Sequence, residues 1–267
     1  MGRFHTFVGV DLGGGKGKHT AVAHLEAVDG GVRVIDYGTG KEGPWFDDRL
    51  LAYLRALAEG SALALDAPLT LPCCVRCQLP QCPGTATCEV PTIAWFRQRA
   101  LLAPASRVKP AYTSYTQRAC EVLLQEVEQM IPREALGQGT GPLTARAAYL
   151  VRALAPQFRR DENFIEVYPK ATVAQLYSTR IAHRYKRSAQ SPATRLQIFN
   201  SLHDLTFAPG AWREDAINND HKFDAILCAY TAYLWAQGAC VPPPDSTVAH
   251  DGWIWIPAKP PQASPMN

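Results

Sequence analysis

The sequence has little that would mark a membrane, secreted or fibrous protein. Its longest uncharged stretch contains residues 225–241, where Thr231, Gln237 and Gly238 interrupt the apolar residues, whereas a membrane-spanning helix needs about 20 mostly apolar residues. The first ten residues contain no apolar core of signal-peptide length. No internal repeat is present, and 47% hydrophobic with 19% charged residues is ordinary for a globular chain. We therefore expect a globular, cytoplasmic protein without a membrane partner.

The excess of positive charge is also small. There are 27 Lys and Arg residues against 24 Asp and Glu residues, a net charge of +3, which does not by itself indicate nucleic-acid binding. Residues 183–187 nevertheless place Tyr185 among cations that include Lys186 and Arg187, a pattern suited to base stacking and phosphate contact. The same run is also typical of a solvated surface.

Apolar periodicity predicts one domain over residues 1–256, followed by a flexible tail, 257–267. Strands are expected at 4–11, 20–25, 32–37, 62–66 and 163–168, with a further short strand possible at 252–257. Helical spacing is found at 46–57, 120–131, 144–154 and 220–236. This order predicts an α/β fold with a mixed five-stranded sheet flanked by helices. A cysteine-rich insertion interrupts it at about residues 72–91.

Four carboxylates stand where such a fold could gather them. Asp11 and Asp66 end predicted strands, Glu166 lies in another, and Asp224 lies on the last helix. Catalytic groups in α/β sheets collect beyond the carboxyl ends of the strands, and clustered carboxylates are ligands for Mg²⁺ or Mn²⁺. A pair of such ions about 4 Å apart can activate water and stabilise the leaving oxygen of a phosphodiester. Each acid taken alone could equally be a strand-end cap or a surface residue.

The residues around these acids resemble a known set of motifs. The set comprises Val8-Gly9-Val10-Asp11, Leu63-Ala64-Leu65-Asp66-Ala67-Pro68, Glu166-Val167-Tyr168-Pro169 and His221-Lys222-Phe223-Asp224-Ala225. Together with the order of elements, they resemble an uncharacterised family of predicted RNase H-like nucleases, distantly similar to the RuvC resolvases. The resemblance extends from Phe7 to about Ile256.

The resemblance implies an RNase H-like fold and a nuclease that uses a metal-activated water without a covalent intermediate. It implies that Asp11 bridges the Mg²⁺ or Mn²⁺ ions and that Asp66, Glu166 and Asp224 share them. His221 could orient the water or the leaving group, or be a structural histidine at the helix end. Lys170 and Lys186 lie where the family tends to have basic residues that could bind substrate.

The glycine-rich segment after the first acid offers an alternative. Lys16 and Lys18 lie among glycines at residues 13–18, but Leu12 and His19 stand where a P-loop requires Gly and Ser or Thr. An ATP-binding phosphotransferase of the actin and sugar-kinase type remains possible from the first hairpin. It would need further glycine pairs downstream, and none follows Gly30-Gly31. Otherwise the segment is a hairpin tip whose lysines could touch substrate phosphate.

The cysteine cluster could hold a metal. Five of the eight cysteines lie within residues 73–88, and Cys74, Cys77, Cys82 and Cys88 could supply four thiolates to a structural Zn²⁺. An iron–sulfur cluster and unligated thiols are the alternatives. A third interpretation of the protein follows, as a non-catalytic nucleic-acid or protein adaptor that works through this insertion. The acids nevertheless favour the nuclease, with nucleic acid as its partner.

Overall fold

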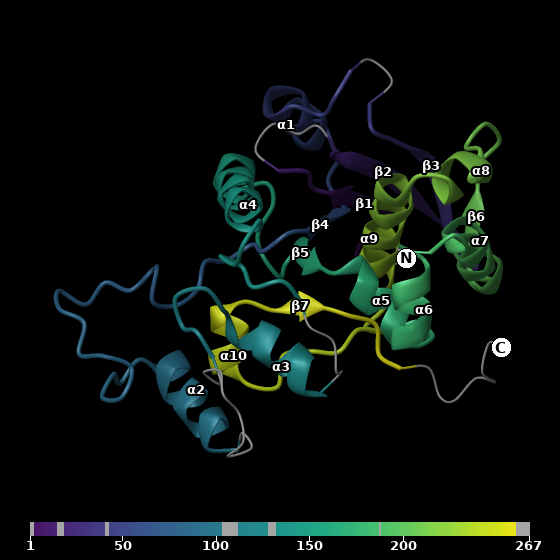
Figure 1. Cartoon of the computed structure of the whole chain (residues 1–267). Coiled ribbons are helices and arrows are strands. Elements are labelled where there is room, and N and C mark those ends of the chain that lie inside the picture. The colour runs from purple at the N-terminus through teal and green to yellow at the C-terminus, as the bar shows by residue number, and fades with distance from the viewer. Residues whose placement is uncertain are drawn as a thin grey trace.

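A mixed β-sheet forms the centre of the protein. The computed structural model describes residues 3–14, 19–40, 43–102, 112–127, 132–186 and 188–259. Within them the strands are β1 (Thr6–Asp11), β2 (Ala21–Val28), β3 (Gly31–Gly38), β4 (Ser61–Asp66), β5 (Phe164–Val167), β6 (Leu205–Phe207) and β7 (Ile254–Trp255). They form one seven-stranded sheet in the order β6-β3-β2-β1-β4-β5-β7 (Figure 1). Strand β2 is antiparallel to β1 and β3, whereas β4, β5 and β7 continue the direction of β1. The α/β fold with a mixed sheet is therefore confirmed.

Helices cover both faces of this sheet. The described helices are α1 (Asp47–Arg55), α2 (Pro91–Leu101), α3 (Ala119–Val127), α4 (Gly141–Leu154), α5 (Pro169–Leu176), α6 (Thr179–Arg184), α7 (Ser191–Ser201), α8 (Arg213–Ile217), α9 (Asp220–Ala236) and α10 (Ser246–Asp251). Helices α1 and α4 lie on one side of the sheet, and α9 lies on the other with α5 to α8 beside it (Figure 1). Helices α2, α3 and α10 gather beyond β7.

The alternation of side chains along each strand assigns residues to these two faces. On β1, Phe7 packs in the core beneath α9, whereas Val8 and Val10 pack against α1 and α4. On β4, Ala62 and Ala64 join the α9 side, and Leu63 and Leu65 join the other. Asp11 and Asp66 continue the α9 series of their strands. Both carboxylates are therefore directed to the face that α9 covers.

A glycine in β1 lets α9 approach the sheet closely. A Cβ atom at Gly9 would overlap the backbone of Ala225 and Ala229 on α9. Interiors are close-packed, so even one added carbon would push the helix away. Gly9 thus sets the spacing between the end of β1 and the first turns of α9.

Two strands were not part of the predicted five. Strand β7 corresponds to the short strand considered possible at 252–257, and β6 has only three residues, too few to show a period. Ala258 still donates its N–H to the carbonyl of Ala239, so ordered backbone hydrogen bonding, outside the sheet itself, reaches the start of the predicted tail. Residues 260–267 lie outside the described residues. No helix in the described part of the chain is both long and apolar enough to cross a membrane.

Candidate functional site

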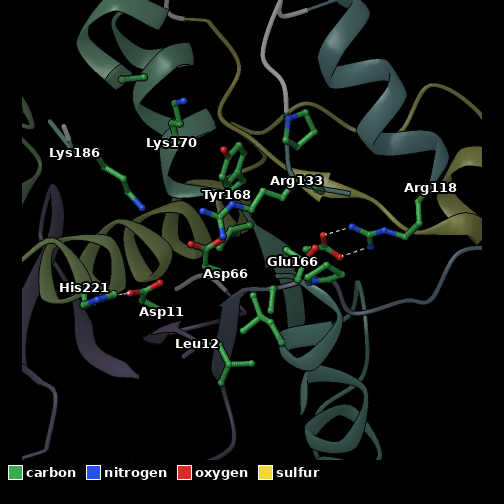
Figure 2. A pocket seen from close by; sticks show the side chains of 18 of the residues that line it. Asp11, Leu12, Asp66, Arg118, Arg133, Glu166, Tyr168, Lys170, Lys186 and His221 are labelled. Carbon is green, nitrogen blue, oxygen red and sulfur yellow. Dashed lines mark hydrogen bonds and ion pairs between the residues drawn. The ribbon is translucent and has the colours of Figure 1, made fainter. Parts of the chain in front are cut away.

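Three of the four predicted acids meet at one end of the sheet. Asp11 ends β1 and Asp66 ends β4, and the two are register partners across this parallel pair. Asp224 lies one turn into α9, where the close approach over Gly9 brings it down onto both strand ends. One carboxylate oxygen from each residue lies within 4.8 Å of the others. This acid triad, Asp11, Asp66 and Asp224, is the centre of the candidate site; Figure 2 shows Asp11 and Asp66 of the triad.

The fourth predicted acid, Glu166, differs from expectation. It pairs in register with Leu65 rather than with Asp66, and Phe164, two residues before it, packs on the α1 and α4 side of the sheet. The two-residue period of β5 therefore turns Glu166 to the face opposite the triad. It still lines the same cavity at the strand end. The structure therefore does not include Glu166 in the group of acids that the sequence predicts to share metal ions.

Glu166 is instead bound by a buried arginine. Arg118 donates from Nη1 to Oε2 at 2.7 Å and from Nη2 to Oε1 at 2.6 Å, and the backbone N–H of Leu69 adds a third bond at 2.8 Å. Arg118 is 1% exposed and also donates from Nε to Glu121 at 2.9 Å. Bidentate arginine–carboxylate pairs are strong and geometrically specific. Both oxygens of Glu166 are thus already engaged (Figure 2).

Two basic side chains contact the triad. Lys186 Nζ lies 2.5 Å from Asp224 Oδ2, and His221 Nδ1 lies 2.6 Å from Asp11 Oδ2. Lys186 is held in place by its neighbour Tyr185, which is fully buried and packs its ring against Phe223 on α9. Both cations were predicted for the site from the sequence. The structure brings them to the acids themselves.

The protein environment disfavours full ionisation of the triad. Removal from bulk water, followed by the charge of Asp11, raises the pKa of Asp66 well above its usual value. Burial also raises the pKa of Asp224, to about 6, against the opposing effect of Lys186. The hydrogen bond to Asp11 raises the pKa of His221. Such shifts follow when like charges and low polarity meet in one place, which is typical of functional sites.

Asp224 is buried beside Asp11 and Asp66, which line a cavity of about 450 Å³. Its wall carries further basic groups, Arg133, Lys170 and His183, together with Tyr168. Strand β5 ends at Val167, so Tyr168 and Lys170 follow it directly into the first turn of α5. Figure 2 shows Arg133 and Tyr168 beside Asp66, with Lys170 and Lys186 above the acids. A cavity that places carboxylates opposite cations suits an anionic substrate held near a metal.

Some predicted substrate-binding residues cannot be placed. Lys16, Lys18 and Arg187 lie outside the described residues. The glycine-rich segment, on which the phosphotransferase alternative depends, is described only at Gly13 and Gly14. Lys170 and Lys186 both line the cavity as the sequence predicts.

The predicted zinc ligands are not gathered. Cys88 is buried beside Phe96 in a small apolar cluster, whereas Cys77 and Cys82 are exposed. All of residues 72–91 are described, and within the described residues the acid triad is the only group of three or more potential ligands close enough to share an ion. The structure therefore does not bring Cys74, Cys77, Cys82 and Cys88 together. Packing of Cys88 into the apolar cluster, away from the exposed thiols, is the physical reason.

Sequence reasoning missed three residues of the site: Arg118, Arg133 and Tyr168. Arg118 follows a segment without apolar period, and its one local indication is the Arg-x-x-Glu spacing to Glu121 at the start of α3. Tyr168 lies within the Glu166-Val167-Tyr168-Pro169 motif but is given no role there, and Arg133 lies in no motif. Tyr168 is found only from its place directly after the acid-bearing strand.

The triad fits a hard divalent cation. Asp224 Oδ1 is buried and has no hydrogen bond of good geometry; the neighbouring buried Tyr185 hydroxyl is its weak partner and lowers the pKa of Asp224. A poorly satisfied buried oxygen is costly, and a cation shared with Asp11 and Asp66 would satisfy it in full. Three carboxylates are a donor set that Mg²⁺ and Mn²⁺ accept.

Comparison with known proteins gives a family but no characterised relative. No curated protein and no solved structure matches the chain. One family model matches residues 9–248, a range that contains the whole triad together with Arg118, Lys186 and His221. The chain therefore belongs to the family described as "Protein of unknown function (DUF429)".

Proposed function

We propose that this protein is a divalent-metal-dependent nuclease that hydrolyses phosphodiester bonds of nucleic acid. The observation that carries the proposal is the meeting of Asp11, Asp66 and Asp224 within 4.8 Å, with Oδ1 of Asp224 buried and without a hydrogen bond of good geometry. Bringing three acids together is electrostatically unfavourable. A bound divalent cation would offset this repulsion and could serve in catalysis.

The arrangement of strands supports an RNase H-like fold for this enzyme, distantly similar to the RuvC resolvases. The run β3-β2-β1-β4-β5 has β2 antiparallel to its neighbours and a long helix crossing β1, an arrangement compatible with the fold that the resemblance implies. The acids lie at the carboxyl ends of neighbouring parallel strands, where α/β sheets place their ligands.

The other side chains of the cavity suit a phosphodiester. Bound Mg²⁺ or Mn²⁺ would supply an activated water and stabilise the leaving oxygen. Lys186, Lys170 and Arg133 would bind the negative phosphate backbone, because all three line the same cavity as the acids. His221 would keep Asp11 in a fixed orientation through its 2.6 Å hydrogen bond.

The test is hydrolysis of end-labelled single- and double-stranded DNA and RNA, with Mn²⁺ or Mg²⁺ and with EDTA. The wild-type protein should cleave at least one of these substrates only when metal is present. Asp11→Asn should abolish cleavage with little change in thermal melting. Asp29→Asn, at an exposed turn position, is the matched control and should keep full activity. Cleavage that persists in Asp11→Asn or in EDTA would refute the proposal.

A further inference from the structure

The site offers three carboxylates to a cation and not four. Glu166 is turned to the opposite face of the sheet by the period of β5, and both of its oxygens are bound by Arg118. Arg118 is in turn fixed by Glu121 and by Thr70, whose hydroxyl lies 3.1 Å from Nη1. To become a ligand, Glu166 would have to leave a buried bidentate ion pair, and Arg118 would then be buried with one partner fewer.

A protein cation already occupies part of the triad. Lys186 Nζ contacts Asp224 through Oδ2, so only Oδ1 of that carboxylate is left without a normal partner. Likewise, Oδ2 of Asp11 is already in contact with Nδ1 of His221. One oxygen of each of these residues, together with Asp66, is the set that remains for a metal.

Lys186 also stays charged in this position. Its Nζ atom lies 2.5 Å from Asp224 Oδ2, and a lysine ammonium group in contact with a carboxylate keeps its charge at neutral pH. Its ammonium group therefore acts as a permanent positive charge next to the triad. A second divalent ion would be repelled by both Lys186 and the first ion, with no fourth carboxylate to offset the repulsion.

We infer that the acid triad binds a single divalent cation and that the Lys186 ammonium group supplies the second positive charge, held on Asp224 and presented to the substrate phosphate. This inference rests on the proposed function and departs from the two-ion arrangement that the sequence predicts. It makes Lys186 a substrate-binding residue whose charge also limits metal binding.

The first test counts ions. Mn²⁺ is titrated into the wild-type protein and into Asp224→Asn, and bound metal is followed by calorimetry and by electron paramagnetic resonance of free Mn²⁺. We expect one ion per chain in the wild type, and a large loss of affinity in Asp224→Asn. Two ions bound to the wild type with similar affinity would overturn the inference and leave the proposed nuclease standing.

The second test removes the lysine charge. Lys186→Met should bind the first Mn²⁺ about tenfold more tightly, because a positive charge beside the ion is lost. Lys170→Met is the matched control, since Lys170 lines the same cavity whereas Lys186 is the lysine whose Nζ atom lies 2.5 Å from Asp224. Its Mn²⁺ affinity should stay within about threefold of the wild type. Nucleic-acid binding by the Mn²⁺-loaded protein should weaken in Lys186→Met even though the metal binds more tightly.

The outcomes separate the two proposals. Equal Mn²⁺ affinities in Lys186→Met and the wild type, with one ion in each, would overturn the role of Lys186 alone. Absence of Mn²⁺ binding in the wild type and in both lysine variants would overturn the inference together with the proposed function.

Discussion

Asp11 and Asp66 are register partners at the ends of the parallel strands β1 and β4, and both face α9. Carboxylates placed side by side repel each other, and Asp224 of α9 adds a third negative group. The raised pKa values of Asp66 and Asp224 express this repulsion together with their removal from water. Without a bound metal ion, the triad therefore lowers the free energy of unfolding.

Asp66→Asn should therefore stabilise the metal-free protein at pH 8. The pKa of Asp66 is raised in the folded state, so its contribution to stability is complete at low pH and is lost as the pH rises through that raised value. Asparagine is neutral throughout, and we expect a gain of about 1–3 kcal/mol at pH 8 that vanishes near pH 4. Urea unfolding in EDTA at both pH values measures it. A less stable Asp66→Asn at pH 8 would contradict the account.

Added Mn²⁺ should reverse the difference in stability between the wild type and Asp66→Asn. The wild type gains the binding free energy of the ion, whereas Asp66→Asn has lost one ligand. Thermal melts at pH 8 with and without Mn²⁺ should show a rise for the wild type and little change for the variant. Equal rises in melting temperature for both proteins would show that the ion binds outside the triad.

His221→Leu should weaken the metal site without unfolding the protein. His221 is half-exposed and orients Asp11 through its Nδ1 atom, and loss of such a supporting hydrogen bond typically costs about 10–100-fold in metal affinity or activity. Mn²⁺ titration of the variant measures the loss. His203→Leu, at an exposed position near β6, is the control. An unchanged Mn²⁺ affinity in His221→Leu would show that His221 does not support Asp11 as a metal ligand.

Arg118→Lys should be strongly destabilising. A lysine cannot reproduce the two parallel bonds to Glu166 and the bond to Glu121, and incomplete pairing of a buried charge costs about 3–5 kcal/mol. Urea unfolding at pH 7 gives the difference. Arg159→Lys, in an ion pair with Glu162 that is more than half exposed, should change stability by less than about 0.5 kcal/mol. A similar small effect in Arg118→Lys would show that the buried network contributes little.

Glu166→Gln distinguishes a structural acid from a metal ligand. It removes the charge that Arg118 pairs with, so it should lower the free energy of unfolding by about 1–3 kcal/mol. Its Mn²⁺ affinity, measured by calorimetry, should stay within about threefold of the wild type, because Glu166 lies outside the triad. A loss of affinity as large as that in Asp224→Asn would restore the four-acid site predicted from the sequence.

The sequence is informative where a pattern is local. The buried runs that end in Asp11 and Asp66 predict strands whose last residues reach the sheet's carboxyl edge, and the apolar helix at 220–236 is found with the same bounds as α9. These elements appear as continuous apolar runs because they are buried on both faces or along most of their length. Short elements such as β6 and α8 have no room for a period and escaped prediction.

The sequence is not informative where a partner is distant. Glu166 lies inside the same kind of apolar run that Asp66 ends, and the register of β5 against β4, one position out of step, turns it to the other face. No local sequence pattern predicts that Glu166 pairs with Arg118, which lies 48 residues earlier in the chain. The cysteine spacing suggests a zinc site, but spacing does not show that Cys88 packs with Phe96 while Cys77 remains at the surface.

The most direct test of the central claim is anomalous diffraction from a crystal soaked in Mn²⁺. The account predicts a manganese peak bound by Asp11, Asp66 and Asp224, with Glu166 still paired to Arg118. A crystal whose triad holds no manganese would contradict the claim that these three acids form the metal centre of a nuclease.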